Sequence, residues 1–422
     1  MSHSLLLFSF LALLTAILVA SLLTLFPQLE PPLLLAGVHL VGQLFLRALM
    51  LLVIPLVVAA LIQGTMRLGA TSSAGRLGLD TLLAFSACMS IAVFFGMMSS
   101  YFLAPSSLMN ELACLAQQPG QPPSSLLPNA AAVGGPWTKV EQLLLQLVPQ
   151  NVLAAASRGE IIGLIGFCGL FGMTLSQLGG TAIETVRLFW IGTFQLLVAM
   201  VQKLMKLMPL GLFALLLDAL ASSPEAAASW HCLLGLAMVL ITTLLTFGLL
   251  LLVVVHLWIR QPIMRTLNAL AAPLLTAFSS SSSAVALPLA LEAMSELGVP
   301  NRISSLVLPL GTTINLAGSA LYVAAVVAFV VITSGQATSI SWPLVYGVTL
   351  ITSMAMAGVP SAALIALMLV LQTLELPTLL IPYILAIDRF IDMVRTVINV
   401  LASSLVTLVL AHRTAGEEAS DQ

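Results

Sequence analysis

Charged residues are scarce in this sequence. Its 422 residues include 14 Lys and Arg and 16 Asp and Glu, together 7% of the chain, whereas a soluble domain carries about 25%. Hydrophobic residues make up 60%, which leaves too little polar surface to cover a compact particle of this size in water. The composition excludes an ordinary soluble enzyme and predicts that the chain folds in lipid.

Other features are missing as well. No cluster of Lys and Arg is available to neutralise a phosphate backbone, so nucleic acid is not expected as a partner. The four cysteines are scattered without CxxC spacing, which argues against a disulfide framework or a structural zinc site. The methionines form no regular cluster, so no transition-metal site is expected either. The sequence has no Gly-rich nucleotide loop and no catalytic-triad pattern, so we expect neither an enzyme nor a cofactor.

Long apolar segments predict an all-α polytopic membrane protein. A helix needs about 20 apolar residues to cross a bilayer core, and eight segments reach that length. They lie at about residues 4–26, 34–64, 76–104, 141–178, 184–220, 228–258, 300–332 and 378–411. The first is interpreted as a membrane helix and not as a signal peptide, because it has no basic leading region. Residues 105–140 are rich in Pro, Gln, Ser and Gly and are expected to form an aqueous loop.

Two further apolar stretches are interrupted by small polar residues and proline. Residues 277–288 read AFSSSSSAVALP, and residues 354–363 read MAMAGVPSAA. The arms beside each interruption span about 12 to 16 residues, which is too short to cross a bilayer, so each stretch is predicted to form a re-entrant helical hairpin. Non-helical backbone at membrane depth is tolerated only where it is buried in protein or lines a cavity, so both tips are expected at an internal site.

The segments that follow the two hairpins are alike. Thr312–Ser319 reads TTINLAGS and Thr396–Ser403 reads TVINVLAS, which favours inverted repeats that meet at a binding site near the bilayer midplane. The basic residues of the short loops fall on one side of the membrane if the N-terminus is inside. The N- and C-termini are therefore both predicted to be cytoplasmic.

The last predicted helix carries ionisable residues inside an apolar segment. At 100° per residue, five polar positions fall within an arc of about 80°. They are Asp388, Asp392, Arg395, Asn399 and Ser403. Ionisable groups in a bilayer are costly, face the bundle interior and mark substrate or ion pathways. The alternative is a structural salt-bridge network in which an aspartate neutralises Arg389.

The residue types on this stripe suit a charged substrate. A guanidinium binds a carboxylate through two hydrogen bonds, and a carboxylate one turn away attracts an ammonium group. Arg395 with Asp392 is therefore predicted to hold a zwitterion that has an additional acid group. The serines at residues 279–283 supply hydroxyl and backbone donors at the first hairpin tip, although such a run can also be a flexible polar linker.

Seven segments occur in an order that is known from one family: FLRALMLLVIPLVVAALIQG, LLQLVPQNVLAAASRGEIIGLIGF, KLMPLGLFALL, SSSSSAVALP, LPLGTTINLAGSALY, AGVPSAA and IDRFIDMVRTVINV. Through them the chain resembles the glutamate/aspartate transporters, also called dicarboxylate/amino acid:cation symporters, over almost its whole length. The resemblance implies eight membrane helices with two re-entrant hairpins, a homotrimer, and a transport domain that slides against a static scaffold like an elevator.

The resemblance also implies where these parts lie. The scaffold would comprise residues 1–74 with helices 1 and 2 and residues 141–222 with helices 4 and 5. The transport domain would comprise helix 3 at residues 75–104 and residues 223–412, the latter with helices 6 to 8 and both hairpins. Residues 105–140 would be an extracytoplasmic loop, and residues 413–422 a cytoplasmic tail.

For the substrate, the resemblance implies roles residue by residue. Arg395 is expected to pair with the side-chain carboxylate and Asp392 with the amino group, while Ser319 stands where the family usually has a threonine. The remaining expected contacts come from the last helix and both hairpin tips: Asn399, Thr396, Ser282, Ser283, Gly358, Val359 and Pro360. Relatives for neutral amino acids lack the arginine and those for plain dicarboxylates tend to lack the aspartate, so the presence of both favours an acidic amino acid.

The chain departs from the family at the cation sites. Where the family has Asn-Met-Asp-Gly-Thr, this chain has Asn-Leu-Ala-Gly-Ser, so a sodium-binding aspartate is replaced by Ala317. A second such aspartate aligns with Ser403, and a hydroxyl pair of helix 3 aligns approximately with Cys88 and Met89. A sodium ion needs several hard oxygen ligands with partial charge compensation. Two family sites are therefore expected to be weakened.

The coupling ion remains open between H⁺ and Na⁺. A third family site, built mainly of backbone carbonyls, is not affected by these replacements. The candidates for cation coupling are Gly311, Asn315, Thr313, Leu316, Ser353, Met356, Ser403 and Asp388. One hypothesis is that coupling is weakened or transferred to protons, with Asp388 or Asp392 as the titrating group, because burial disfavours the charged form of a carboxyl. The other is sodium coupling through fewer ions. The hairpin 1 arginine of the family aligns with Ser281, and Arg389 is a candidate to supply that charge from helix 8.

Taken together, these features predict a secondary active symporter in the inner membrane of a bacterium, surrounded by lipid. It would import L-glutamate or L-aspartate with H⁺ or Na⁺. Two alternatives remain: a symporter of the same fold for a C4-dicarboxylate, cystine or another amino acid, and an uncoupled channel or sensor.

Overall fold

The computed structural model describes residues 11, 15, 19, 32–71, 76–103, 145, 148–158, 161–221, 230–337, 340–354, 356, 362–374, 376–377 and 381–420. Every regular element within these ranges is a helix. Five helical segments among them are long and apolar enough to cross a membrane: Leu77–Phe102, Thr181–Leu204, Leu234–Ile259, Asn301–Thr333 and Ile387–Thr414. The predicted all-α polytopic class is confirmed. The predicted first helix, apart from three isolated positions, and the predicted 105–140 loop lie outside the described residues.

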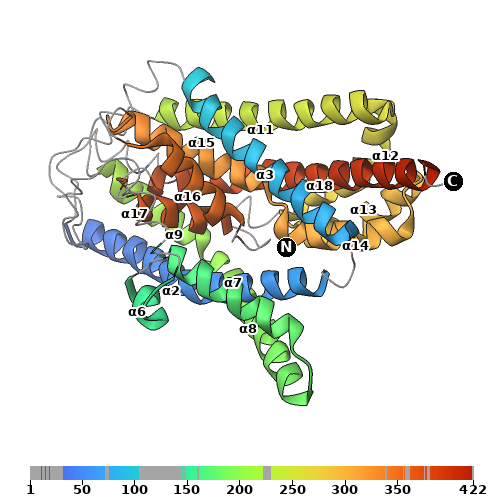
Figure 1. The fold of residues 1–422 in the computed structure, drawn as a ribbon. Coiled ribbons are helices and arrows are strands. Elements are labelled where there is room, and N and C mark those ends of the chain that lie inside the picture. Colours follow the sequence, from blue (N-terminus) through green and yellow to red (C-terminus); the bar gives the residue numbers. More distant parts are fainter. Residues whose placement is uncertain are drawn as a thin grey trace.

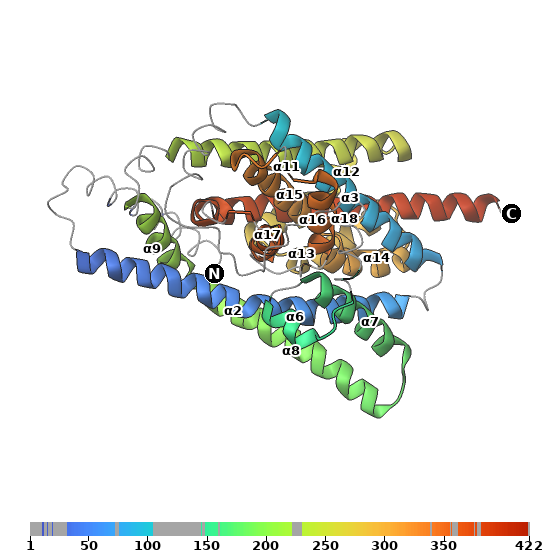
Figure 2. The same ribbon diagram turned by 60° about the vertical axis from the view of Figure 1, so that its left-hand side comes forward.

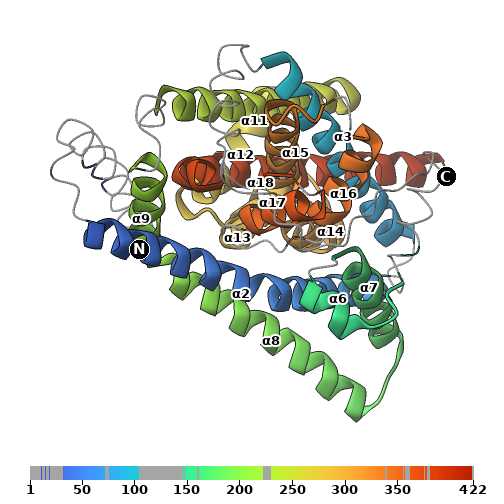
Figure 3. The same ribbon diagram turned by 90° about the vertical axis from the view of Figure 1, so that its left-hand side faces the viewer.

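One group of helices gathers around α2. Its members are α2 (Pro32–Thr71), α6 (Val152–Arg158), α7 (Ile161–Gln177), α8 (Thr181–Met205) and α9 (Met208–Ala221). Helices α7, α8 and α9 all pack against α2, and α2 and α8 lie along one side of the molecule (Figures 1 and 3). The segment predicted as one helix at 184–220 is divided between α8 and α9. Pro209, in the first turn of α9, has no N–H to continue the helical ladder.

The remaining helices form a second group around α18. They are α3 (Arg76–Leu103), α11 (Trp230–Ile259), α12 (Ile263–Ser280), α13 (Ser283–Glu296), α14 (Asn301–Ile314), α15 (Ala317–Thr333), α16 (Trp342–Met354), α17 (Ala362–Thr373) and α18 (Ile381–Ser420). Helix α18 runs through the middle of this group (Figure 2) and packs against α11, α12, α14 and α15. Glycine permits the close packing of α3 on α15, because a Cβ on Gly96 would clash with the carbonyl oxygen of Leu321.

Two pairs of short helices correspond to the predicted hairpins. Helices α12 and α13 pack against each other and are joined at Ser281 and Ser282, where Ser281 has a φ of 51° in the left-handed region. Helices α16 and α17 also contact each other. The hydroxyl of Tyr346 on α16 forms a hydrogen bond with Ser90 on α3, which fixes the first arm of the second hairpin to the α18 group.

The membrane segment predicted at 300–332 is present as Asn301–Thr333, but its helix is interrupted in the middle, which was not predicted. Asn315 and Leu316 lie between α14 and α15 with ψ angles of 73° and 51°. The Asn399 side chain on α18 accepts hydrogen bonds from the N–H groups of Gly318 and Ser319 at 2.8 and 3.2 Å. It therefore caps the start of α15, which compensates for the interrupted ladder.

Candidate functional site

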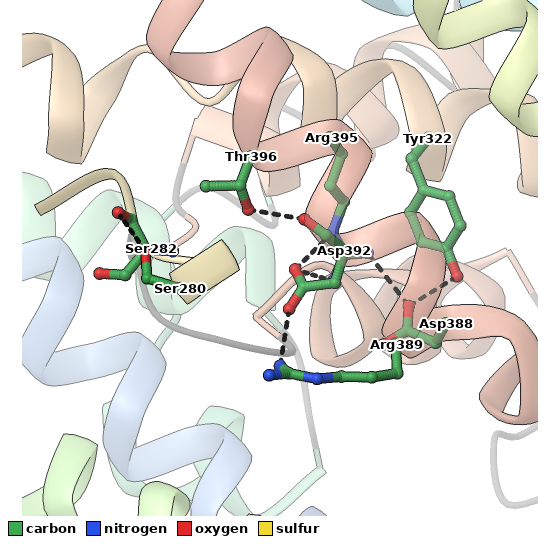
Figure 4. Close-up of polar contacts among 8 residues, drawn as sticks. All are labelled: Ser280, Ser282, Tyr322, Asp388, Arg389, Asp392, Arg395 and Thr396. Carbon is green, nitrogen blue, oxygen red and sulfur yellow. Dashed lines mark hydrogen bonds and ion pairs between the residues drawn. The ribbon is translucent and has the colours of Figure 1, made fainter. Parts of the chain in front are cut away.

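Four ionisable side chains of α18 form a buried cluster. Asp388, Arg389, Asp392 and Arg395 are between 0% and 8% exposed, and they lie on neighbouring turns (Figure 4). Two aspartates and two arginines sum to zero formal charge. Burying charges is costly unless they are paired and hydrogen-bonded. Pairing the two arginines with the two aspartates lowers the cost of burying all four.

Arg395 is held tightly by both aspartates. Its Nε donates to Oδ1 of Asp392 at 2.9 Å, and its Nη2 lies 2.7 Å from the same oxygen. Its Nη1 donates to Oδ1 of Asp388 at 3.1 Å. The guanidinium is therefore already neutralised within the protein. A substrate carboxylate would have to replace at least one of these contacts.

Tyr322 on α15 completes the surroundings of Arg395. Its buried hydroxyl donates to Oδ1 of Asp388 at 3.0 Å, and its ring centroid lies 4.7 Å from the guanidinium carbon of Arg395, a cation–π distance. Tyr322 was not among the residues predicted from the sequence. A usable signal existed, because Tyr322 lies three positions after Ser319 and therefore shares its helix face.

Arg389 is held more loosely. Its Nη1 lies 3.6 Å from Oδ2 of Asp392, and its Nε is buried without a hydrogen-bond partner among the described residues. The outer oxygens Oδ2 of Asp388 and Asp392 also lack hydrogen bonds within that part of the chain. The cluster thus retains carboxylate oxygens that can accept hydrogen bonds from a ligand.

Three further residues predicted to bind substrate lie on α18 or contact it: Asn399, Ser319 and Thr396. Besides capping α15, Asn399 donates from Nδ2 to Oγ of Ser319 at 3.2 Å. The Thr396 hydroxyl donates to the backbone carbonyl of Asp392 at 2.6 Å. In this structure these side chains are engaged by protein groups, so Asn399 and Ser319 join α15 to α18 beside the ionisable residues.

The first hairpin tip faces the same region of α18 (Figure 4). Ser280 Oγ accepts a hydrogen bond from the N–H of Ser282 at 3.2 Å, and the buried Ser283 begins α13. The Ser281 hydroxyl is buried with no hydrogen-bond partner in the described ranges. The three residues predicted at the second hairpin tip lie outside the described residues: Gly358, Val359 and Pro360.

The positions predicted for cation coupling form a second, uncharged polar region. Asn315 donates from Nδ2 to Oγ of Ser403 at 3.4 Å, and its Oδ1 is buried without a hydrogen-bond partner among the described residues. A Cβ on Gly311 would lie 2.8 Å from both Cβ and Oγ of Ser403, so these backbones are in close contact. Ala317 is fully buried. This region has no carboxylate among these residues to balance a bound cation.

The backbone oxygens of the third predicted cation site are engaged locally. The carbonyl of Leu316 accepts from the N–H of Ala320 at 2.8 Å, and that of Ser353 accepts from the N–H of Met356 at 3.3 Å. The Thr313 hydroxyl donates to a carbonyl of its own helix at 3.0 Å. Each carbonyl oxygen keeps a second lone pair. No group of three or more His, Cys, Asp or Glu able to hold a metal ion occurs in the described part of the chain.

The chain is similar to known proteins over most of its length. The model of the sodium:dicarboxylate symporter family matches residues 5–413. The chain is 29% identical over 372 residues to the proton/sodium-glutamate symport protein of Bacillus caldotenax, which covers 88% of this chain and 86% of the relative. It is 28% identical to the proton/glutamate-aspartate symporter of Escherichia coli (strain K12), with 88% and 84% covered. It is 26% identical to the C4-dicarboxylate transport protein of Laribacter hongkongensis (strain HLHK9), with 88% and 82% covered.

Proposed function

Because the chain belongs to the sodium:dicarboxylate symporter family, and is therefore a multi-pass membrane transporter and not an enzyme, we propose that it imports L-glutamate or L-aspartate together with a cation. The observation that carries this proposal is the buried Arg395 between Asp388 and Asp392. A guanidinium can bind an acid group of the substrate, and a neighbouring carboxylate can bind its ammonium group. Relatives named as glutamate and glutamate-aspartate symporters support the same substrate class.

In the proposed complex, the substrate's side-chain carboxylate takes over one of the Arg395 contacts, and its ammonium group binds Oδ2 of Asp392. The α-carboxylate lies between Asn399 and the two hairpin tips. The other proposed contributors are Thr396, Ser319, Ser282, Ser283, Gly358, Val359 and Pro360. This assignment is supported by the orphaned Oδ2 oxygens and by the proximity of Ser319 and Asn399 to the cluster.

For the coupling ion we propose a proton, with Asp388 as its carrier. The replacements at Ala317 and Ser403 remove the carboxylates that a sodium ion would need, and Asn315 points an N–H group at the Ser403 oxygen. When substrate displaces Arg395 from Asp388, that buried carboxylate loses its counter-charge, and protonation restores neutrality. Sodium coupling through the carbonyls of Leu316 and Ser353 is the competing candidate, since those oxygens do not depend on side chains.

The test is uptake of radiolabelled aspartate into proteoliposomes with a sodium gradient or a proton gradient imposed separately. We expect the proton gradient alone to drive accumulation, and we expect Arg395→Ala to abolish it. Uptake that requires sodium would refute proton coupling. Sodium-independent uptake that persists unchanged in Asp388→Asn would refute Asp388 as the carrier. Absence of uptake under both gradients would refute the proposed substrate, and uptake without accumulation would indicate a channel.

A second candidate cargo is a C4-dicarboxylate, because one similar protein is named as a C4-dicarboxylate transport protein. Succinate has no ammonium group to occupy Asp392. We therefore expect unlabelled aspartate to compete with labelled aspartate far better than succinate does. Equal competition by the two would favour the dicarboxylate.

We also propose that the protein forms a homotrimer in a bacterial inner membrane, with both termini cytoplasmic. The α2 group would be the static scaffold, and α3 with α11 to α18 the moving transport domain. This division is supported by packing, because helices of each group contact one another more extensively than they contact the other group. The trimer is carried over from the resemblance to the family.

A further inference from the structure

The two arginines of the α18 cluster are held in different ways. Arg395 has three nitrogen–oxygen contacts between 2.7 and 3.1 Å with the two aspartates. Arg389 has one ion pair at 3.6 Å, beyond hydrogen-bonding distance, and its Nε has no hydrogen-bond partner in the described residues. It is nevertheless only 8% exposed. Among the described residues, the Arg389 guanidinium therefore has fewer and longer contacts with carboxylates than that of Arg395, and charge pairing compensates less for its burial.

The two carboxylate oxygens of Asp392 have different partners. Oδ1 is occupied by Arg395. Oδ2 faces the Arg389 guanidinium (Figure 4) and accepts no hydrogen bond from the described residues. It is also the oxygen left for the ammonium group in the proposed substrate complex. Arg389 and the ammonium group therefore compete for a single carboxylate oxygen.

We propose that Arg389 is a tethered cation that pairs with Asp392 while the site is empty and yields this carboxylate to the ammonium group of the substrate. The inference rests on the proposed function, because it requires a substrate that carries an amine. The long contact makes Arg389 easy to displace. Its covalent tether returns it to Asp392 once the substrate leaves, so that Asp392 does not remain as an unpaired buried charge.

This role has a consequence for the transport cycle. A symporter that accumulates substrate must return empty from the inside to the outside, whereas exchange of internal for external substrate uses only the loaded form. In the empty form Arg389 is the cation beside Oδ2 of Asp392, whereas in the loaded form the ammonium group of the substrate takes that place. Loss of Arg389 should therefore hinder the empty return more than the loaded movement. It should also strengthen substrate binding, because the competitor for Oδ2 is gone.

The test compares net uptake with exchange in proteoliposomes. Net uptake is measured into vesicles without internal substrate, exchange into vesicles preloaded with unlabelled aspartate, and the aspartate Kd on the purified protein. For Arg389→Gln we expect net uptake to fall about tenfold, exchange to stay within about twofold, and Kd to fall about threefold or more. Arg389→Lys, which keeps the charge, should restore much of the net uptake. Arg413→Gln is the matched control, because Arg413 lies on the same helix with its side chain 53% exposed.

A merely structural role would weaken binding and both fluxes together, so tighter binding distinguishes the proposal from a general defect. Equal falls in exchange and net uptake, or an unchanged Kd, would overturn it. If Arg389→Gln does not fold, Arg389→Lys decides: its shorter side chain should hold Asp392 less well and lower the aspartate Kd, and an unchanged Kd would contradict the proposal. A wild-type protein that neither binds nor exchanges aspartate would instead refute the proposed function.

Discussion

Two segments that both qualify as membrane spans differ almost completely in burial. The Asn301–Thr333 segment contains α14 and α15, and 94% of its most apolar stretch is buried within the protein. In the Thr181–Leu204 segment of α8, the corresponding share is 6%. Lipid is as apolar as a leucine side chain, so exposed apolar residues on α8 carry no penalty in a bilayer. Apolar character alone therefore identifies a span but does not indicate whether it lies inside the protein.

Polar side chains do distinguish the two segments. In the first segment, three buried polar side chains contact α18: Asn315 between α14 and α15, and Ser319 and Tyr322 on α15. On α8, Lys203 is exposed, and the Arg187 guanidinium donates to three carbonyls near the C-terminal end of α7. Arg187 thus satisfies the end of a neighbouring helix, whereas the polar groups around α18 build the candidate site. The following substitutions test this contrast.

The largest difference in stability should come from removing one cationic side chain from α18 and one from α8. Arg395→Ala leaves two buried aspartates without their main partner, and breaking such a network typically costs about 3 to 5 kcal/mol. Lys203→Ala on α8 removes an exposed charge and should change stability by less than about 0.5 kcal/mol. Thermal unfolding of the purified proteins in detergent measures both. Similar melting temperatures for the two variants would contradict the structural importance of the α18 cluster.

A smaller contrast is expected from adding one methyl group to a glycine. A Cβ on Gly318 would clash with the carbonyl oxygen of Arg395 and lie 2.9 Å from Cβ of Ile398, whereas a Cβ on Gly192 of α8 would meet nothing within 4 Å. Gly318→Ala should force α15 away from α18 at a cost of about 1 to 3 kcal/mol and impair aspartate binding. Gly192→Ala should be neutral or stabilising, because alanine is the better helix former. Melting temperatures and aspartate affinity check both variants, and a tolerated Gly318→Ala would show that this interface is looser than the structure indicates.

The sequence predicted the features that depend on local spacing and missed those that depend on distant contacts. Apolar length located most helices, and the 100° rotation per residue placed Asp392, Arg395 and Asn399 on one buried face of α18. The break between α14 and α15 was missed because Leu316 and Ala317 keep the segment apolar. Its cap comes from Asn399, a residue 81 positions after Gly318. Tyr322 was missed for the same reason, since its partner Asp388 lies 66 positions away.

The smallest contrast in stability is expected from removing the Asn399 cap of α15. The substitution tests whether α18 maintains the break between α14 and α15. Asn399→Leu removes the acceptor for the N–H groups of Gly318 and Ser319 and should cost about 1 to 2 kcal/mol. The same change at Asn268, which is exposed on α12, should have little effect. Hydrogen exchange of the α15 start, measured by mass spectrometry, should be faster in Asn399→Leu only. If exchange there is unchanged, α15 begins at Ala317 for reasons within its own sequence, and the two helices are less strongly coupled than their hydrogen bonds indicate.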